Sequence, residues 1–195
     1  MGRTAGRSPE DTRRALLDAA GEVIRTRGIN ATLDDIARHA GVSKGGLIYH
    51  FASKDELLRE VARTLLAAFR AEVDSHLDPD DTAPGRFTRA YVRALLAPAQ
   101  DPAAARRSLA LLSQLSTIPA VAELVDADTE RFNAELAADG LPTDVMLLVT
   151  SAADGVSSAP MWGASTTGPE YRRLEDRLIR LTHEPSLWQS LPWSS

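Results

Sequence analysis

Residues 32–58 read TLDDIARHAGVSKGGLIYHFASKDELL, and this stretch decides the expected fold. Thr32 is a good N-cap, the next turn is acidic, and apolar residues recur at helical spacing as far as Ala40. Gly41 stands where a left-handed residue closes a helix, and Ser43 can cap a second short helix over residues 44–50. The stretch therefore predicts two helices joined by a tight glycine turn, in which the second helix can enter the major groove of DNA.

The second predicted helix contains two adjacent glycines, Gly45 and Gly46, each of which costs about 1 kcal/mol relative to alanine inside a helix. One interpretation is that a bare backbone approaches a phosphate or a base edge closely. The other is a frayed first turn without function. The exposed side is expected to carry polar groups beside these glycines: Lys44, Tyr49 and His50. The inner side is expected to carry apolar residues: Leu47, Ile48 and Phe51.

The chain contains only two lysines, Lys44 and Lys54, against twenty arginines, and both lie in this segment. A lysine ammonium can reach a phosphate as a point charge, without the bidentate geometry that arginine favours. The coincidence supports a DNA contact at this segment. The alternative is chance placement in an arginine-rich composition.

At this spacing, residues 10–60 resemble the tetracycline-repressor (TetR) family of bacterial transcription regulators. The matching residues follow an amphipathic first helix: Thr32, Ile36-Ala37, Ala40-Gly41-Val42-Ser43, Gly45, Leu47, Tyr49-His50-Phe51 and Lys54-Asp55-Glu56-Leu57-Leu58. The resemblance implies a repressor that binds a double-stranded DNA operator. It implies a contact surface made of Thr32, Lys44, Gly45, Gly46, Tyr49, His50 and Lys54, and Ser43, the cap of the second helix, is a further candidate contact. Family members often carry Thr, Ser or Ala at the position of Gly46, which has no side chain to read a base.

The net charge of −5 is unevenly distributed along the chain. Residues 1–55 hold nine basic and seven acidic residues, a net of +2, whereas the remaining residues hold thirteen basic and twenty acidic, a net of −7. A positive end suits phosphate contact, and an acidic body would be repelled by DNA and so orient the molecule. The absence of cysteine excludes disulfides and zinc–thiolate sites. With no long apolar run and a polar, basic N-terminus, we expect a soluble cytoplasmic protein without membrane contact.

An all-α fold of about nine helices is expected, since no segment shows sustained alternation of apolar and polar residues. Residues 1–8 are expected to form a flexible arm, in which Arg3 and Arg7 either fold onto DNA or remain a free tail. Residues 9–55 are expected to form a three-helix helix-turn-helix head, and residues 56–195 a larger helical domain for effector binding and dimerisation. Helices are expected from about residue 9 to 28, at the two positions above, and at about 54–76, 84–97, 102–116, 119–138, 142–160 and 167–183.

The last two long helices carry apolar stripes that suit either a core or a two-fold interface. A homodimer is favoured because a dimeric DNA-binding protein places its two recognition helices about 34 Å apart, in successive major grooves. The resemblance implies a seam formed by these helices. The candidate seam residues are Val145, Val149, Ala152, Val156, Tyr171, Leu174, Leu178 and Leu181.

A small-molecule effector of unknown identity is expected to bind the larger domain. Its candidate contacts are apolar or aromatic groups of the kind that line ligand pockets, together with one carboxylate: Phe69, Tyr91, Leu112, Phe132, Met146, Asp154, Met161 and Trp162. Each apolar member could instead be plain core. Asp154 could meet a cationic or hydroxylated ligand, or an arginine, or cap a kink before Gly155.

Other functions have less support in the sequence. The four histidines show no metal-ligand spacing, and no Gly-rich phosphate loop or nucleophile elbow is present, so neither an enzyme nor a bound cofactor is expected. The alternatives are an enzyme whose site is assembled from distant residues, and an interaction protein of the same fold that no longer binds DNA. The expected mechanism is a two-state dimer that a ligand shifts away from the DNA-binding state.

Overall fold

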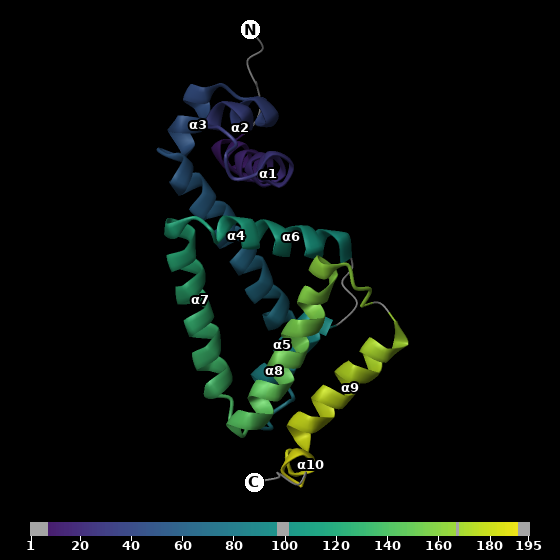
Figure 1. Cartoon of the computed structure of the whole chain (residues 1–195). Helices are drawn as coiled ribbons and strands as arrows, with labels where there is room; N and C mark the ends of the chain where they lie inside the picture. Colours follow the sequence, from purple (N-terminus) through teal and green to yellow (C-terminus); the bar gives the residue numbers. More distant parts are fainter. Residues whose placement is uncertain (1–7, 97–101, 167, 191–195) are drawn as a thin grey trace. The chain divides into compact units, whose positions relative to one another are not determined.

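The computed structural model describes residues 8–96, 102–166 and 168–190, and the regular secondary structure of these residues is helical, without strands (Figure 1). The nine expected helices lie at the expected places among the described residues, with ends shifted by a few residues: α1 Pro9–Arg27, α2 Leu33–Ala40, α3 Lys44–His50, α4 Lys54–Ser75, α5 Arg86–Leu96, α6 Pro102–Leu115, α7 Pro119–Ala137, α8 Thr143–Ser158 and α9 Pro169–His183. Two short elements were not expected, the 3-10 helix η1 Ala159–Trp162 and α10 Ser186–Gln189.

Side-chain caps explain where the first helices begin. The Ser8 hydroxyl accepts a hydrogen bond from the Asp11 N–H at 3.0 Å, and Asp11 accepts one from the Ser8 N–H, which completes a capping box with Pro9 at the first helical position. Thr32 and Asp35 form the same box at the start of α2. Local sequence therefore fixes the entry of the chain into both helices.

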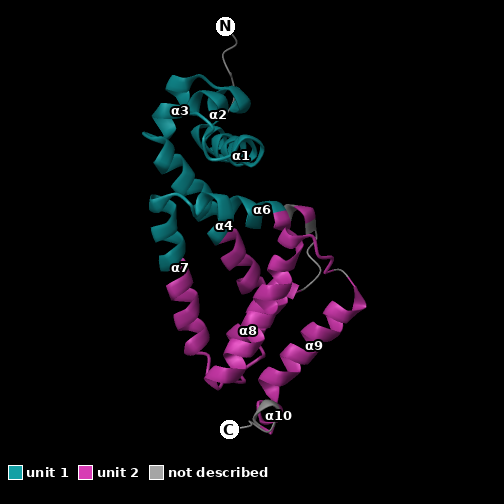
Figure 2. Cartoon of the chain, viewed as in Figure 1, with its two compact units in different colours: residues 1–66, 107–127 teal, residues 67–106, 128–195 magenta. Residues whose placement is uncertain are grey.

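The chain divides into two compact units (Figure 2). Unit 1 consists of residues 1–66 and 107–127, and its core is one apolar cluster. Its large, fully buried side chains come from α1 to α4, α6 and α7 and from Phe51, which follows α3: Leu16, Ile24, Ile36, Leu47, Phe51, Leu57, Leu58, Leu115 and Val121. The core of unit 1 thus includes one residue of α3, Leu47, and the residue that follows this helix, Phe51.

One arginine ties three elements of unit 1 together. The Arg13 guanidinium on α1 lies 4.3 Å from the centre of the Phe51 ring and donates a 3.2 Å hydrogen bond to the His50 carbonyl. It also forms a 3.0 Å ion pair with Glu60 on α4. The carboxyl end of α3 is therefore fixed to both neighbouring helices.

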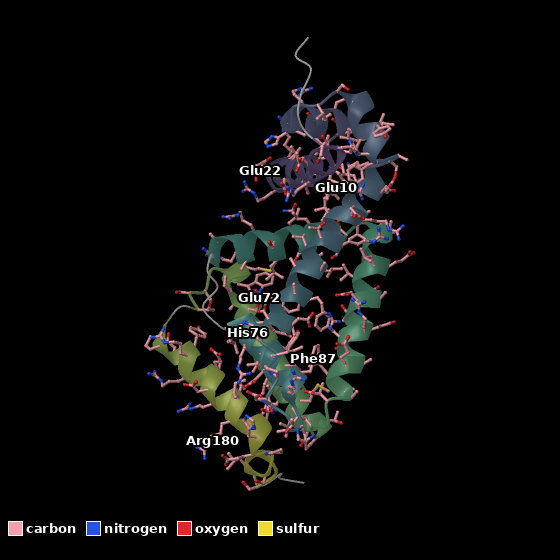
Figure 3. The ribbon with its side chains drawn as sticks, turned by 180° about the vertical axis from the view of Figure 1, so that it is seen from behind. Glu10, Glu22, Glu72, His76, Phe87 and Arg180 are labelled. Carbon is pink, nitrogen blue, oxygen red and sulfur yellow. The ribbon has the colours of Figure 1, made fainter. Side chains whose placement is uncertain are left out.

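Unit 2 consists of residues 67–106 and 128–195, and its interior is built on α5, α8 and α9. Val92 packs there against a buried stripe of the two later helices: Val145, Val149, Ala153 and Leu178. A second cluster is aromatic and contains Phe69, Phe87, Tyr91 and Phe132, with ring centres 5.6–6.0 Å apart in the four contacting pairs (Phe87 is labelled in Figure 3).

A network of hydrogen bonds lies at the start of α5 in unit 2. The Asp139 carboxylate, from the loop after α7, accepts hydrogen bonds from the N–H groups of Phe87 and Thr88 at 3.0 and 2.7 Å. The Arg89 guanidinium is completely buried, and all five of its N–H groups have acceptors: both Asp81 oxygens, the carbonyls of Ala83 and Pro84, and the Thr182 hydroxyl. These bonds tie the loop before α5 to the end of α9.

Among the described residues, no single helix has both the length and the apolar character needed to cross a membrane.

Candidate nucleic-acid interface

The turn between α2 and α3 is set by one left-handed glycine. Gly41 has φ 72° and ψ 28°, and its N–H donates to the carbonyls that end α2. Ser43 then starts α3, because its hydroxyl accepts a 3.0 Å hydrogen bond from the Gly46 N–H. Leu47 is fully buried and fixes the rotation of α3 about its own axis. The chain thus builds a helix-turn-helix with a defined outer face.

The outer face of α3 carries Lys44, Gly45, Ile48 and Tyr49, all of which are exposed. Tyr49 is 82% exposed, so its hydroxyl is free to meet a phosphate. Ile48 is 46% exposed, which shows that its prediction as an inner apolar residue was wrong. At about 100° per residue, position 48 lies close to position 44 and turns away from the buried position 47.

The two lysines occupy different environments. The Lys44 ammonium is exposed and lies 2.9 Å from the equally exposed Asp34 carboxylate. Such a surface pair is worth about 0–1 kcal/mol, so a phosphate can compete for this lysine. The Lys54 ammonium donates to the Ile29 carbonyl and is partly buried, so it links the start of α4 to the loop after α1.

Three other predicted contact residues lie at the margins of this face. Thr32 is exposed, but its hydroxyl already accepts from the Asp35 N–H and donates to the Asp35 carboxylate at 2.7 Å. The hydrogen bonds that the Thr32 hydroxyl and the Thr32 N–H donate to the Asp35 carboxylate lower the pKa of Asp35. The Gly46 and His50 residues are partly buried, and the His50 ring stands edge-on to the Tyr49 ring at 5.2 Å. Arg3 and Arg7 of the predicted arm lie outside the described residues.

Half of the predicted effector contacts come together in unit 2. Phe69 and Phe132 both contact the Tyr91 ring, and the Tyr91 hydroxyl donates a 2.6 Å hydrogen bond to Asp154 on α8. The other predicted contacts do not join this group. Leu112 packs against the core of unit 1, Met146 is half-buried on α8, and Met161 and Trp162 are exposed on η1, Trp162 by 84%.

Asp154 is exposed, but the surrounding protein removes part of the hydration of its carboxylate. This desolvation raises its pKa, and the hydrogen bond from Tyr91 opposes the rise only in part. Burial, and then the bond to Asp154, also raise the pKa of Tyr91 far above its ordinary value. Among the described residues, no cation pairs with Asp154, and Tyr91 is its one hydrogen-bond donor. A desolvated carboxylate with an unused oxygen therefore lies beside an aromatic cluster.

Burial divides the predicted dimer seam into two sets. Val145 and Val149 are completely buried within the chain and Leu178 is 6% exposed, so these three have almost no surface to offer a partner. For them the structure corrects the prediction, because their stripe faces Val92 of the same unit. The remaining seam residues are partly exposed: Ala152, Val156, Tyr171, Leu174 and Leu181.

The sequence did not reveal the cation that lies over the aromatic cluster. The Arg70 guanidinium lies 3.8 Å from the centre of the Phe132 ring and forms two hydrogen bonds with Glu135, at 2.6 and 2.9 Å. Arg70 and Glu135 are 65 residues apart in the chain, and no local pattern connects them. Unlike Asp154, this arginine is neutralised by its own partner.

Comparison with known proteins agrees with this geometry. A family model described as "Bacterial regulatory proteins, tetR family" matches residues 16–61, and one described as "Tetracyclin repressor-like, C-terminal domain" matches residues 85–183. The HTH-type transcriptional regulator SrpR of Pseudomonas putida is 40% identical over 81 residues, which cover 41% of this chain and 36% of SrpR. The HTH-type transcriptional repressor KstR2 of Mycobacterium tuberculosis is 38% identical over 96 residues, which cover 47% of this chain and 48% of KstR2.

The match to these relatives spans half of their length or less. Solved structures match over more of the chain. A transcriptional regulator from Rhodococcus sp. Rha1 has a TM-score of 0.67 and 25% identity, covering 92% of this chain and 97% of its own. The multidrug binding protein EbrR, solved with malachite green, has a TM-score of 0.67 and 23% identity, covering 87% of this chain and 97% of its own, and shares the fold.

Proposed function

The chain belongs to the tetR family of bacterial regulatory proteins, and from this premise we propose that it represses transcription by binding a palindromic DNA operator as a homodimer. The observation that carries the proposal is the outer face of α3, where Tyr49 and Lys44 are exposed while Leu47 holds the helix in place. A short helix held in this way fits the major groove, with its polar groups toward the phosphates. The proposed contacts are those predicted from the sequence.

The homodimer follows from the geometry of B-DNA. Two recognition helices must lie about 34 Å apart to enter successive major grooves, which one copy of α3 cannot do. We place the seam on the partly exposed residues of α8 and α9, because their buried neighbours are used within the chain. The proposed parts are an arm at 1–8, a DNA-binding head at 9–55 and an effector and dimerisation domain at 56–195, in a protein that acts in the cytoplasm.

A small-molecule effector is the second part of the proposal. Its site would include Asp154 and Tyr91 with the neighbouring aromatic rings, where an unpaired carboxylate and π faces suit a cationic organic molecule. The fold is shared with EbrR, a multidrug binding protein. An effector that binds the DNA-free state better would release the operator, on the usual scale of about 1–3 kcal/mol, or about 5–150-fold in affinity.

Selection of bound duplexes from a random DNA pool, at low salt and without effector, tests the function. We expect enrichment of an inverted repeat whose half-site centres lie about one helical turn, or a multiple of it, apart. The double variant Lys44→Ala, Tyr49→Phe should enrich nothing. Enrichment of no palindrome by the wild-type chain, or a monomer in sedimentation analysis, would overturn the proposal.

A further inference from the structure

The outer face of α3 carries one large apolar side chain, Ile48, among its exposed residues. At about 100° per residue, the exposed positions follow one another around the helix in the order Lys44, Ile48, Gly45 and Tyr49. Ile48 therefore lies between Lys44 and Gly45 on this face, and Gly45 and Tyr49 lie nearest the point opposite the buried Leu47. A face of this kind can place Lys44 and Tyr49 near polar groups of DNA, and at Ile48 it offers only apolar contact.

Among the described residues, Ile48 belongs to none of the core clusters. It is 46% exposed, although its neighbour Leu47 is completely buried in the core cluster of unit 1. A β-branched residue is also a weaker helix former than alanine or leucine. Neither core packing nor helix propensity therefore explains a large apolar side chain at this position.

The two glycines of α3 also differ. A Cβ atom built on Gly46 would lie 3.3 Å from the Ser43 hydroxyl oxygen, which is a tight contact with the cap. A Cβ built on Gly45 would meet nothing closer than 4.0 Å. The bare backbone at Gly45 thus leaves open space directly beside Ile48, and a DNA base can approach Ile48 there.

We infer that Ile48 reads the methyl group of a thymine in the major groove. Thymine is the only unmodified base that offers an apolar group at this edge, where the other bases show donors and acceptors. An isoleucine pressed against those polar edges would exclude water from them without replacing its hydrogen bonds, which is unfavourable. Ile48 is thus a specificity-determining residue, and each half-site carries a T·A pair at one fixed position.

This inference rests on the proposed function, and one chemical change in the DNA separates the two. The operator enriched by the wild-type chain is resynthesised with deoxyuridine at each thymine in turn, which removes the methyl and leaves base pairing intact. At one position per half-site we expect affinity to fall about fourfold, the value of one buried carbon, and about fifteenfold when both half-sites are changed. Thymines outside the half-sites should show no effect.

The protein side of the test uses three variants. Ile48→Ala should bind the thymine operator more weakly and should no longer distinguish it from the deoxyuridine operator. Ile48→Val, which keeps methyl groups at the same position, should still distinguish the two operators. Leu187→Ala, at another exposed apolar residue (44% exposed, on α10), should behave as the wild type. Since Ile48 is exposed, melting temperatures of all three should stay close to the wild-type value.

Each outcome has one meaning. Equal binding of the thymine and deoxyuridine operators at every position, or discrimination that persists in Ile48→Ala, would overturn the inference and leave the repressor function standing. Enrichment of no duplex at all would overturn both.

Discussion

The Arg89 guanidinium and the Asp81 carboxylate form a two-pronged ion pair, with both N–O distances at 2.7 Å and the arginine side chain completely buried. Because the other Arg89 donors are also used, the pair fixes the loop before α5 to the end of α9. The Asp81 carboxylate offsets the free-energy cost of burying the Arg89 charge in the interior of unit 2.

Replacing Asp81 with asparagine should therefore destabilise the chain by about 3–5 kcal/mol, because Arg89 would keep its charge without a buried counter-charge. Urea denaturation followed by circular dichroism measures the loss. The matched control is Glu184→Gln, in the exposed Arg180–Glu184 pair, where we expect less than about 1 kcal/mol (Arg180 is labelled in Figure 3). Equal losses of unfolding free energy in the two variants would show that the burial of Arg89 does not increase the contribution of its ion pair to stability.

The same pair should make stability sensitive to acid. The hydrogen bond from Arg89 lowers the pKa of Asp81 in the folded chain below its unfolded value. The stabilisation is therefore complete above the unfolded pKa of about 3.9 and is lost as pH falls through the lower folded pKa. The melting temperatures of the wild type and of Asp81→Asn should become equal in that acid range and should differ at neutral pH.

Asp154→Asn should raise the melting temperature at neutral pH. Desolvation raises the pKa of Asp154 in the folded state, so between the unfolded and the folded pKa the native chain binds more protons, and stability falls as pH rises through this window. Asparagine removes that loss and can still accept from the Tyr91 hydroxyl. The gain should be full above the folded pKa and vanish below about pH 4.

The control for this prediction is Asp126→Asn, an exposed acid on α7, which should leave the melting temperature unchanged. If Asp154 contacts the effector, Asp154→Asn should also respond less to organic cations in an operator-release assay. A lower melting temperature in Asp154→Asn at neutral pH would contradict the desolvation argument.

Gly45→Ala separates the two interpretations of the glycine-rich helix. Because the new methyl has open space, it should stabilise the free chain by up to about 1 kcal/mol. If the backbone at Gly45 approaches DNA closely, the same methyl should weaken operator binding by about tenfold. Calorimetry and fluorescence anisotropy measure the two effects. Ser113→Ala, on an exposed position of α6, should stabilise the chain and leave affinity unchanged. Unchanged affinity in Gly45→Ala would favour the frayed turn.

Lys44→Ala should weaken binding to all DNA sequences and make it less dependent on salt. Loss of one phosphate contact per protomer should reduce the slope of log affinity against log salt by about 0.9 for each protomer. Arg172→Ala, which removes an exposed cation of α9, is the control and should leave the slope unchanged. A salt slope that Lys44→Ala does not alter would mean that the lysine keeps its pairing with Asp34 on DNA.

Local signals were enough to predict the helices and their beginnings. Ser8, Thr32 and Ser43 act as caps within a few residues of the groups that they bind, so a short window of sequence contains both partners. Ile48 shows the limit of this approach. Seven residues give α3 fewer than two turns, too few for a pattern of apolar residues to fix its inner side, and the packing of Leu47 decided it instead.

Long-range polar contacts and the choice between core and interface could not be predicted. Arg89 and Thr182 lie 93 residues apart, and each is ordinary in its own segment. Val145 and Val149 were expected at a dimer seam because an apolar stripe marks any buried surface, whether a partner or the same chain covers it. Only the position of Val92 in the folded unit assigns the stripe to the interior.

The three contacts of Arg13 have a consequence for how binding would proceed. With the last carbonyl of α3 held and Phe51 covered, this helix is already ordered in the free chain. Docking would then carry little entropic cost from folding, and the heat-capacity change should reflect only the surface that is buried. A rigid α3 also cannot change its shape to fit a wrong base pair. The protein would therefore dissociate from a mismatched site at once, without a slow rearrangement first.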